Sequence, residues 1–437
     1  MSPASPAGGE PAEAAGVEAR IAAGVLLEAA LARRGGLDEA MNQAALRRLS
    51  PRDRGFARAA AMAALRRLGD IDAALDARLK KPPPAAVRTV MRIAAAQMLV
   101  LETPAFAAVS TAVRQAERDG ALRPFKGLIN AVLRGLARDG FPDTPAEANL
   151  PPWLAARWIA AWGVDTARAV AAAGRTEPPT DLTARTPADS QALAAEVEGR
   201  VLPGGSVRAG LRGEITGWPG FVAGRWWVQD AAAAVPARLL APTPGETVLD
   251  LCAAPGGKTL QLAAAGGAVT ALDRSEPRLR RLRENLTRTG LEAEVIAVPA
   301  ENWDDPRTFD AVLLDAPCSA TGTFRRNPES LWATRPADIG KLADVQHRLL
   351  DAAAARVRPG GRLVYCVCSL EREEGETQII AFVRRHPQFR LVPADPAACG
   401  APAEALAAEG WLRILPSMWA AEGGVDGFFA ARLERAG

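Results

Sequence analysis

The stretch from Val248 to Thr259, VLDLCAAPGGKT, constrains the fold of this chain more than any other. The apolar residues around Asp250 predict a short buried strand that ends at a Gly-Gly turn. Gly256 and Gly257 carry no Cβ, so the backbone can come close to a large ligand there, and the Leu/Ala-rich segment that follows predicts a helix. Strand, glycine turn and helix in this order are typical of the opening of a nucleotide-type βαβ unit.

A phosphate-binding loop is the main alternative, because Gly257-Lys258-Thr259 matches the end of that motif. The motif also needs a glycine five residues before Gly257, and Cys252 stands there, which disfavours it. A purely structural turn stays open on this evidence alone. Asp273, however, ends the next apolar run, AVTALD, where a carboxylate can accept hydrogen bonds from ribose hydroxyls. The pattern favours a cofactor with an adenosine part.

Predicted strands and helices alternate from Gln229 to the end of the chain. The predicted strands lie in VLDL, AVTALD, AEVIAV, FDAVLLDAP, GRLVYCVCS and FFAARLE. Such alternation predicts an α/β domain at 229–437 with a doubly wound, mostly parallel sheet that binds ligands at the carboxyl ends of its strands.

The chain before this domain divides into three predicted parts. Residues 1–17, rich in Pro, Ala, Gly and Glu, predict a disordered tail. Residues 18–141 show helical periodicity, with breaks at sites such as Ser50-Pro51, and predict an all-α domain. Residues 142–228 begin with a Pro-rich linker and predict a small α+β module.

Charge and aromatic content leave the partner of the helical region open. The net charge is only +3, so local patches must decide whether the chain binds nucleic acid. An arginine cluster in this region is either a solvated face or a nucleic-acid patch; its members are Arg47, Arg48, Arg52, Arg54, Arg58, Arg66 and Arg67. Three tryptophans at helical spacing, Trp153, Trp158 and Trp162, favour core packing over base stacking.

Five cysteines are present, with no CxxC pair and no Cys/His cluster at zinc spacing, so we expect no structural metal. The chain has no signal sequence and no long apolar run. These features predict a monomer in the reducing cytoplasm without a membrane partner.

Two predicted strand ends carry cysteines. One reads Asp315-Ala316-Pro317-Cys318 and the other Tyr365-Cys366-Val367-Cys368. A single cysteine at such a place is usually a small buried apolar residue. Two at the ligand-facing edge, one with an aspartate three residues before it, favour covalent catalysis, in which a thiolate adds to an electron-poor centre and an acid neutralises the developing charge.

Four motifs resemble the RsmB/NOP/Sun family of S-adenosylmethionine-dependent RNA cytosine C5-methyltransferases. They are VLDLCAAPGGKT, LLDAPCSATGTFRRNP, YCVCSLEREEGE and DGFFAARL, and they occur in the family's order between Gln229 and Leu433. The resemblance implies a Rossmann-like class I methyltransferase domain. The helix from Pro124 to Arg138, PFKGLINAVLRGLAR, resembles the last helices of the NusB-like RNA-binding fold and implies the bacterial branch that modifies small-subunit (16S) ribosomal RNA.

The resemblance also implies roles for particular residues. The cofactor loop is then Cys252, Ala253, Ala254, Pro255, Gly256, Gly257 and Lys258. Asp273 contacts the ribose, and Asp315 lies near both the methionine end of the cofactor and the target base. Cys368 is the nucleophile and Cys318 helps to release the product, while Cys366 is structural.

This chemistry suits cytosine, whose carbon 5 accepts a methyl group only after a nucleophile has added at carbon 6. A soft thiolate suits that addition, Asp315 can act as an acid at N3, and Cys318 can take the carbon 5 proton. In the loop after Cys318, Arg325 and Arg326 follow an aromatic residue and suit RNA stacking and phosphate contact. A solvated arginine pair is the alternative.

One departure from the family pattern concerns the adenine contact. Pro299 stands about where the family has an acidic residue, and Glu301 follows two places later, so this contact has no assigned residue. Three other functions stay open: methylation of tRNA or another RNA, a DNA cytosine methyltransferase in which Cys318 attacks, and a non-catalytic RNA-binding or assembly factor.

Overall fold

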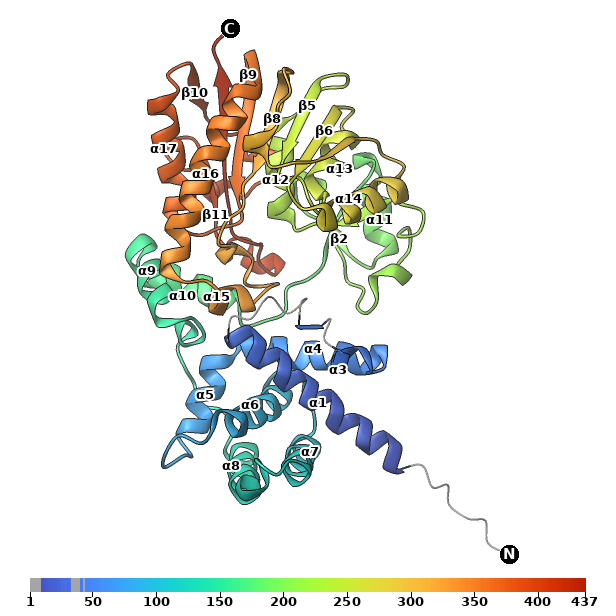
Figure 1. Cartoon of the computed structure of the whole chain (residues 1–437), viewed down its shortest axis with the longest axis vertical. Helices are drawn as coiled ribbons and strands as arrows, with labels where there is room; N and C mark the ends of the chain where they lie inside the picture. Colours follow the sequence, from blue (N-terminus) through green and yellow to red (C-terminus); the bar gives the residue numbers. More distant parts are fainter. Residues whose placement is uncertain (1–8, 33–39, 42–43) are drawn as a thin grey trace, which may run out of the picture. The chain divides into compact units, whose positions relative to one another are not determined.

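The computed structural model describes residues 9–32, 40–41 and 44–437. The chain forms two compact units (Figure 1). The helical unit contains the chain up to Thr176 together with 327–333, and the sheet unit contains 177–326 and 334–437.

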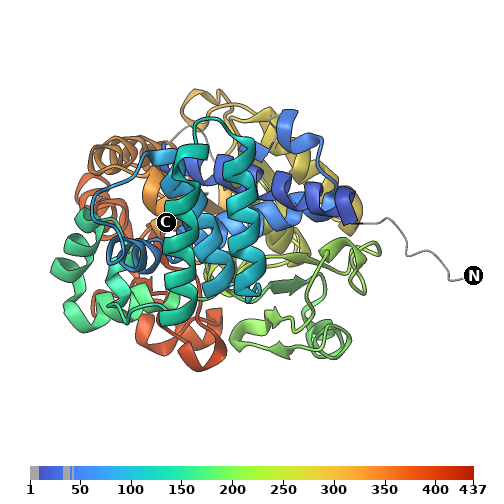
Figure 2. The same ribbon diagram turned by 90° about the horizontal axis from the view of Figure 1, so that it is seen from below.

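The helical unit is built from amphipathic helices that bury alanine and leucine faces, such as Leu26, Leu65 and Leu133, in one core. Its helices are α1 (Gly9–Leu31), α3 (Ala44–Arg47), α4 (Pro51–Arg66), α5 (Leu68–Asp76), α6 (Ala85–Leu99), α7 (Ala105–Arg118), α8 (Lys126–Asp139), α9 (Pro152–Trp162), α10 (Val164–Ala173) and α15 (Glu329–Ala333). Helices α7 and α8 lie side by side (Figure 2). Trp158 is buried, as the packing interpretation predicts.

The start of the chain differs from the predicted disordered tail. The part of that prediction at 1–8 lies outside the described residues, whereas 9–17 form the first turns of α1. The tail prediction is therefore wrong for 9–17, because an Ala/Glu-rich segment that looks too polar to fold alone still has good helix propensity and continues into a helix packed on the core.

The predicted boundary at 141/142 is also not where the two units divide. Helices α9 and α10 belong to the helical unit, and the sheet unit begins at Glu177. Buried Arg66 explains this, since its Nη1 donates to the carbonyl oxygens of Gly174 at 3.3 Å and Thr176 at 3.2 Å. These bonds fix the segment after α10 to α4, which the proline-rich linker gave no reason to expect.

The sheet unit begins with a small antiparallel sheet in the order β2-β3-β1-β4. Its strands are β1 (Asp181–Ala184), β2 (Arg200–Val201), β3 (Val207–Arg208) and β4 (Trp226–Val228), and α11 (Ser190–Glu196) packs on them. Leu182, Leu193 and Trp226 are buried between the sheet and the helix. This is the predicted small α+β module.

The larger sheet has the order β10-β12-β9-β8-β5-β6-β7, and β11 pairs with β12. Its strands are β5 (Thr247–Leu251), β6 (Ala268–Asp273), β7 (Glu294–Ala297), β8 (Phe309–Asp315), β9 (Val357–Val367), β10 (Phe389–Val392), β11 (Leu412–Ile414) and β12 (Phe428–Arg435). Strands β5 to β9 pair in parallel, and β12 is antiparallel to β9. The predicted doubly wound, mostly parallel sheet is confirmed.

Alternate residues of each strand pack on opposite faces of this sheet, as the two-residue period of a strand requires. Val248 and Val364 share a core with α12 (Ala231–Leu240), while Leu249 and Leu363 share one with α16 (Pro336–Arg356). The remaining helices of the sheet unit are α13 (Gly257–Ala264), α14 (Glu276–Thr289), α17 (Glu376–Arg385) and α18 (Pro396–Cys399). The strand order reverses direction between neighbours β5 and β8, and a crevice at the carboxyl ends of the strands is expected there.

Candidate active site

The predicted glycine turn follows β5 directly. Cys252 and Gly256 have positive φ angles of 62° and 109°, and α13 begins at Gly257. A Cβ on Gly256 would lie 2.3 Å from Cδ1 of Leu282, so a larger residue there would clash with α14. Asp273, at the end of β6, is buried and accepts the Ala254 N–H at 3.2 Å. The loop and this carboxylate are therefore held together at one edge of the sheet.

A buried carboxylate at this edge has an oxygen without a partner. Thr259 donates its hydroxyl to Oδ2 of Asp250 at 2.6 Å, whereas Oδ1 of Asp250 has no hydrogen-bond partner among the described residues. Burial raises the pKa of Asp250 to about 7. A buried acceptor left without a donor is costly to the fold, and such atoms commonly mark the place of a ligand.

Lys258, on the first turn of α13, forms an ion pair with Asp315 at the end of β8. The Nζ–Oδ2 distance is 2.7 Å, and Nζ also lies 5.1 Å from the ring centre of Phe428. Burial opposes the charge on Lys258, but the neighbouring Asp315 carboxylate raises the pKa of the lysine above its ordinary value. Lys258 therefore stays an ammonium group within the site.

The two predicted catalytic cysteines face each other. Strands β8 and β9 are parallel neighbours that pair Asp315 with Cys366, so the chain segments that follow them emerge side by side. The Sγ atoms of Cys318 and Cys368 lie 3.5 Å apart. The hydrogen bond to Cys368 and burial both raise the pKa of the Cys318 thiol. Cys318 therefore stays a protonated thiol within hydrogen-bond distance of the Cys368 sulfur.

Cys366 is fully buried and donates its S–H to Oδ1 of Asp315 at 3.5 Å. Burial and the Asp315 carboxylate raise the pKa of this thiol. A buried thiol with a raised pKa is a poor nucleophile, which agrees with a structural role for Cys366.

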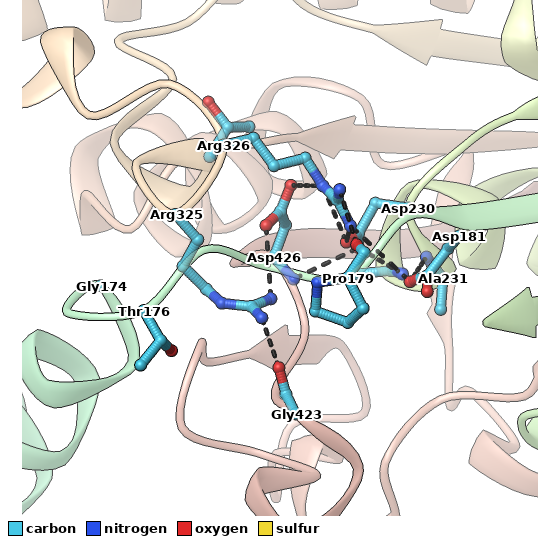
Figure 3. A network of polar contacts seen from close by, with 12 residues as sticks. Gly174, Thr176, Pro179, Asp181, Asp230, Ala231, Arg325, Arg326, Gly423 and Asp426 are labelled. Carbon is cyan, nitrogen blue, oxygen red and sulfur yellow. Dashed lines mark hydrogen bonds and ion pairs between the residues drawn. The ribbon is translucent and has the colours of Figure 1, made fainter. Parts of the chain in front are cut away.

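The predicted RNA-contacting arginines do not form an exposed pair. Arg325 is 2% exposed and its Nη2 donates to the carbonyl oxygen of Gly423. Arg326 donates through Nη2 to Asp230 at 2.6 Å and through Nε to Asp426 at 3.1 Å (Figure 3). The interpretation of Arg325 and Arg326 as surface phosphate ligands is wrong for this structure, because both guanidinium groups form ion pairs with buried carboxylates from distant parts of the chain.

The carboxylates that pair with these arginines belong to three buried aspartates. Asp181 lies on β1, Asp230 caps the N-terminus of α12, and Asp426 precedes β12. Asp181 also accepts two hydrogen bonds from Arg208, at 2.7 and 2.8 Å. The network joins the small sheet, α12 and the segment after Cys318, so it holds the walls of the site in place.

Sequence reasoning missed Glu374, which is buried and contacts the residues that follow Cys318 and Cys368, the two predicted catalytic cysteines. Its signal was hidden, because the run Glu371-Arg372-Glu373-Glu374 reads as a solvated charged turn.

A small cavity of about 70 Å³ opens beside Asp273 at the ends of the strands. Cys252, Pro299, Glu301 and Pro317 line it, together with Arg278. Pro299, which stands where the family has an acidic residue, thus lies on the cavity wall together with Glu301.

The arginine cluster of the helical unit divides into buried and exposed members. Arg66 is buried and Arg67 pairs with Asp70. The exposed members that form no ion pair among the described residues are Arg47, Arg48, Arg52 and Arg58.

Two further observations limit the kinds of site present. In the part of the chain that the structure describes, no three His, Cys, Asp or Glu side chains are grouped so as to hold a metal ion. Within the same residues, every helix is too short or too polar to cross a membrane.

Comparisons with known proteins agree with this geometry. Residues 237–434 match the family described as 16S rRNA methyltransferase RsmB/F, and residues 17–138 match the NusB family. The ribosomal RNA small subunit methyltransferase B of Xanthomonas campestris is 38% identical over 87% of this chain and 91% of its own length. Its namesake in Vibrio cholerae is 35% identical over 90% of this chain and 92% of its own length.

Solved structures show the same fold over most of the chain. The crystal structure of PH0851 has a TM-score of 0.72 and 25% identity, and the match covers 95% of this chain and 99% of that one. A methyltransferase homologue from Pyrococcus horikoshii has a TM-score of 0.53 and 28% identity, covering 69% of this chain and 98% of that one. The chain therefore belongs to the RsmB/F family of 16S rRNA methyltransferases and contains a NusB-family region in its helical unit.

Proposed function

We propose that this protein transfers the methyl group of S-adenosylmethionine to carbon 5 of a cytosine in 16S ribosomal RNA through a covalent cysteine adduct. The observation that carries the proposal is the pair of Cys318 and Cys368 sulfur atoms, 3.5 Å apart and next to the Lys258–Asp315 ion pair. A nucleophile, a second thiol and a fixed positive charge then all face the place where a base would bind.

The residues around the glycine turn fit S-adenosylmethionine. Asp273 suits the ribose hydroxyls because it is fixed by backbone N–H groups at the end of β6, next to the cavity. The unpartnered Oδ1 of Asp250 suits the positively charged methionine part. When bound, the cofactor supplies an electrophilic methyl group. Glu301 on the cavity wall is our candidate for the adenine side.

Cys368 is the proposed nucleophile at carbon 6. The Lys258 ammonium lies close enough for its charge to interact with the Cys368 sulfur, and the Cys318 sulfur lies within hydrogen-bond distance of it. A nearby positive charge stabilises a thiolate, which is the reactive form of a cysteine. In this step, the sulfur forms a bond to carbon 6, and the electron pair of the 5,6 double bond shifts to the bond between carbons 4 and 5. Negative charge then develops at N3, and carbon 5 becomes nucleophilic.

The ion pair changes the role expected of Asp315. A carboxylate that already neutralises Lys258 is poorly suited to donate a proton to N3. As an acceptor it suits the exocyclic amino group of cytosine, which uracil lacks. We therefore propose that Asp315 selects cytosine, and that Lys258 offsets the negative charge that develops on the ring.

Cys318 is the proposed base for product release. After methyl transfer, carbon 5 carries a proton that must leave before the Cys368–carbon 6 bond can break. The Cys318 thiol first gives its own proton to water, and the thiolate so formed, 3.5 Å from the Cys368 sulfur, takes the carbon 5 proton. The raised pKa of this thiol makes its thiolate a strong base. The electron pair of the broken carbon 5–hydrogen bond re-forms the 5,6 double bond. The bond between carbon 6 and Cys368 breaks, and Cys368 leaves as a thiolate.

The exposed arginines of α3, α4 and the turn between them are the proposed RNA contacts in place of Arg325 and Arg326. Arg47, Arg48, Arg52 and Arg58 have no carboxylate partner among the described residues. Guanidinium groups of this kind bind phosphate oxygens, and binding is then weakened by salt. Replacing the four with glutamine should lower RNA affinity and its salt dependence, with methylation of a saturating RNA retained.

We also propose that the protein works as a monomer in the cytoplasm. The five cysteines are all free thiols, which suits a reducing compartment. Lys258, Asp315 and both catalytic cysteines come from one chain, so the proposed chemistry needs no second copy.

Bisulfite mapping of cellular RNA tests the reaction. A deletion strain should lose 5-methylcytosine at one 16S position, and wild-type protein should restore it while Cys368→Ser should not. Loss of the mark from tRNA or DNA instead would contradict the substrate, and full restoration by Cys368→Ser would contradict the nucleophile. RNA with 5-fluorocytosine at the target position should trap wild type and Cys318→Ala as covalent adducts, but not Cys368→Ala.

A further inference from the structure

Glu374 is fully buried at the end of a short 3-10 turn, Arg372–Glu374, that follows the Cys368 segment. Its Oε1 accepts the Ser319 N–H at 2.9 Å and the Gln346 Nε2 amide at 3.1 Å. Its Oε2 accepts the Ser319 hydroxyl at 2.5 Å and the Ser369 hydroxyl. One carboxylate therefore receives four donors from three separate segments of the chain.

The two serines are the immediate neighbours of the catalytic cysteines. Ser319 follows Cys318 after β8, and Ser369 follows Cys368 after β9. The serine Oγ atoms lie 3.1 Å apart, and both donate to the same Oε2. The regular sheet has ended at this point, and the Gly322 N–H donates to the Cys368 carbonyl oxygen at 3.0 Å. Glu374 adds the contacts that join the residues directly after the two cysteines.

A carboxylate suits this place for a physical reason. It only accepts hydrogen bonds, so both serine hydroxyls must point toward it and are held in one orientation. Burial raises the pKa of Glu374, whereas the Ser319 and Ser369 hydroxyl donors act in the opposite direction. A buried carboxylate is tolerated only when such donors surround it, so the group is strongly bound to both segments.

We propose that Glu374 is a positioning residue that holds the Cys318 and Cys368 segments together, so that both sulfurs reach the same base. The inference rests on the proposed function, in which Cys368 attacks and Cys318 removes a proton. If the spacing is lost, Cys368 still forms its adduct, but Cys318 resolves it slowly. The covalent protein–RNA adduct then accumulates relative to methylated product.

Diamide oxidation measures the spacing without RNA. This oxidant takes the two hydrogen atoms from a thiol pair and leaves a disulfide, and peptide mass mapping identifies the Cys318–Cys368 link. The variants are Glu374→Gln, Ser319→Ala and Ser369→Ala. Glu246→Gln is the control, because it removes a carboxylate that pairs with Arg362 at 2.5 Å, far along the sequence from either cysteine.

We expect Glu374→Gln and Ser319→Ala to lower the rate of Cys318–Cys368 disulfide formation about tenfold and product release roughly tenfold to hundredfold, because catalysis is sensitive to small misplacements. S-adenosylmethionine affinity and the Glu246→Gln control should stay at wild-type values. The ratio of covalent adduct to product should rise in the Glu374, Ser319 and Ser369 variants and stay unchanged in Glu246→Gln.

Unchanged disulfide rates and adduct ratios in these variants would overturn the inference. If Glu374→Gln does not fold, Ser319→Ala decides, since it removes one hydroxyl only. A wild-type protein that methylates no cytosine would instead refute the proposed function, and the diamide rates would still report on the spacing.

Discussion

Two clusters of buried charge in the sheet unit differ in how their charges are matched. The structural cluster contains three carboxylates and three guanidinium groups, from Asp181, Asp230, Asp426, Arg208, Arg325 and Arg326. The strand-end cluster contains three carboxylates, from Asp250, Asp273 and Asp315, one buried ammonium group, from Lys258, and the thiols of Cys318 and Cys368.

The difference separates groups that stabilise the fold from groups that await a ligand. In the structural cluster each carboxylate has a guanidinium partner, which offsets the cost of burial. In the strand-end cluster Asp315 pairs with Lys258 and Asp273 pairs with the more exposed Arg278, whereas Asp250 has no ion-pair partner among the described residues. A buried carboxylate without such a partner is costly to the empty protein, and a positively charged ligand would offset that cost. An arginine in a motif should therefore be assigned as an RNA contact only when the folded structure gives it no buried carboxylate partner.

The largest effect is expected from Cys368→Ser, which should lower the rate of methyl transfer on the order of 10³-fold or more, because a hydroxyl adds to carbon 6 far more poorly than a thiolate. Single-turnover transfer of labelled methyl groups measures this. The variant should unfold at the wild-type urea concentration, because it touches only the strand-end cluster. A large loss of stability would show that the two clusters are not independent.

The second effect is a loss of stability, which is expected from Asp230→Ala in the structural cluster. The change leaves Arg326 without its partner at 2.6 Å and removes the cap on the Ala232 N–H. The free energy of unfolding should fall by about 3 kcal/mol, as for other broken buried pairs. Urea denaturation measures it. Asp230→Asn, which keeps the cap, should lose less, and equal losses would mean that the ion pair contributes little.

The third effect is on cofactor affinity. Asp273→Asn should weaken S-adenosylmethionine binding by roughly tenfold, because one hydrogen bond from a ribose hydroxyl to a charged acceptor is lost. Isothermal titration calorimetry measures this, and the exposed Asp304→Asn is the matched control. Equal affinities for the two variants would remove Asp273 from the proposed site.

The smallest effect concerns an ion pair outside both clusters. Arg362 lowers the pKa of Glu246 from its ordinary 4.5 to about 2. Because the folded pKa is depressed, the pair stabilises the protein above pH 4.5, and this contribution is lost as the pH falls toward 2. Glu246→Gln should cost about 1 kcal/mol at neutral pH and nothing near pH 2, since partly exposed pairs contribute little. Urea unfolding across this pH range checks the slope.

Local sequence was enough to predict the glycine turn and the strand ends that carry the candidate site. The turn at Gly256 and the place of Asp273 at the end of the next strand both follow from strand and turn patterns within a few residues. Contacts such as Arg326 with Asp230 join positions almost a hundred residues apart, and no pattern within either segment indicates them. The Ser319–Glu374 bonds, which join positions 55 residues apart, were hidden for the same reason.

The sequence by itself determined the order of strands and helices, the cofactor loop and the two cysteine motifs, since these depend on periodicity and on residue types with special backbone or chemical properties. Only the tertiary structure decided which charges are matched. Arg325 and Arg326 form ion pairs with buried aspartates, and Asp315 forms one with Lys258. The segments after both cysteines donate hydrogen bonds to Glu374. Charge matching depends on burial and on distance in space, and both arise only when strands from distant parts of the chain come together.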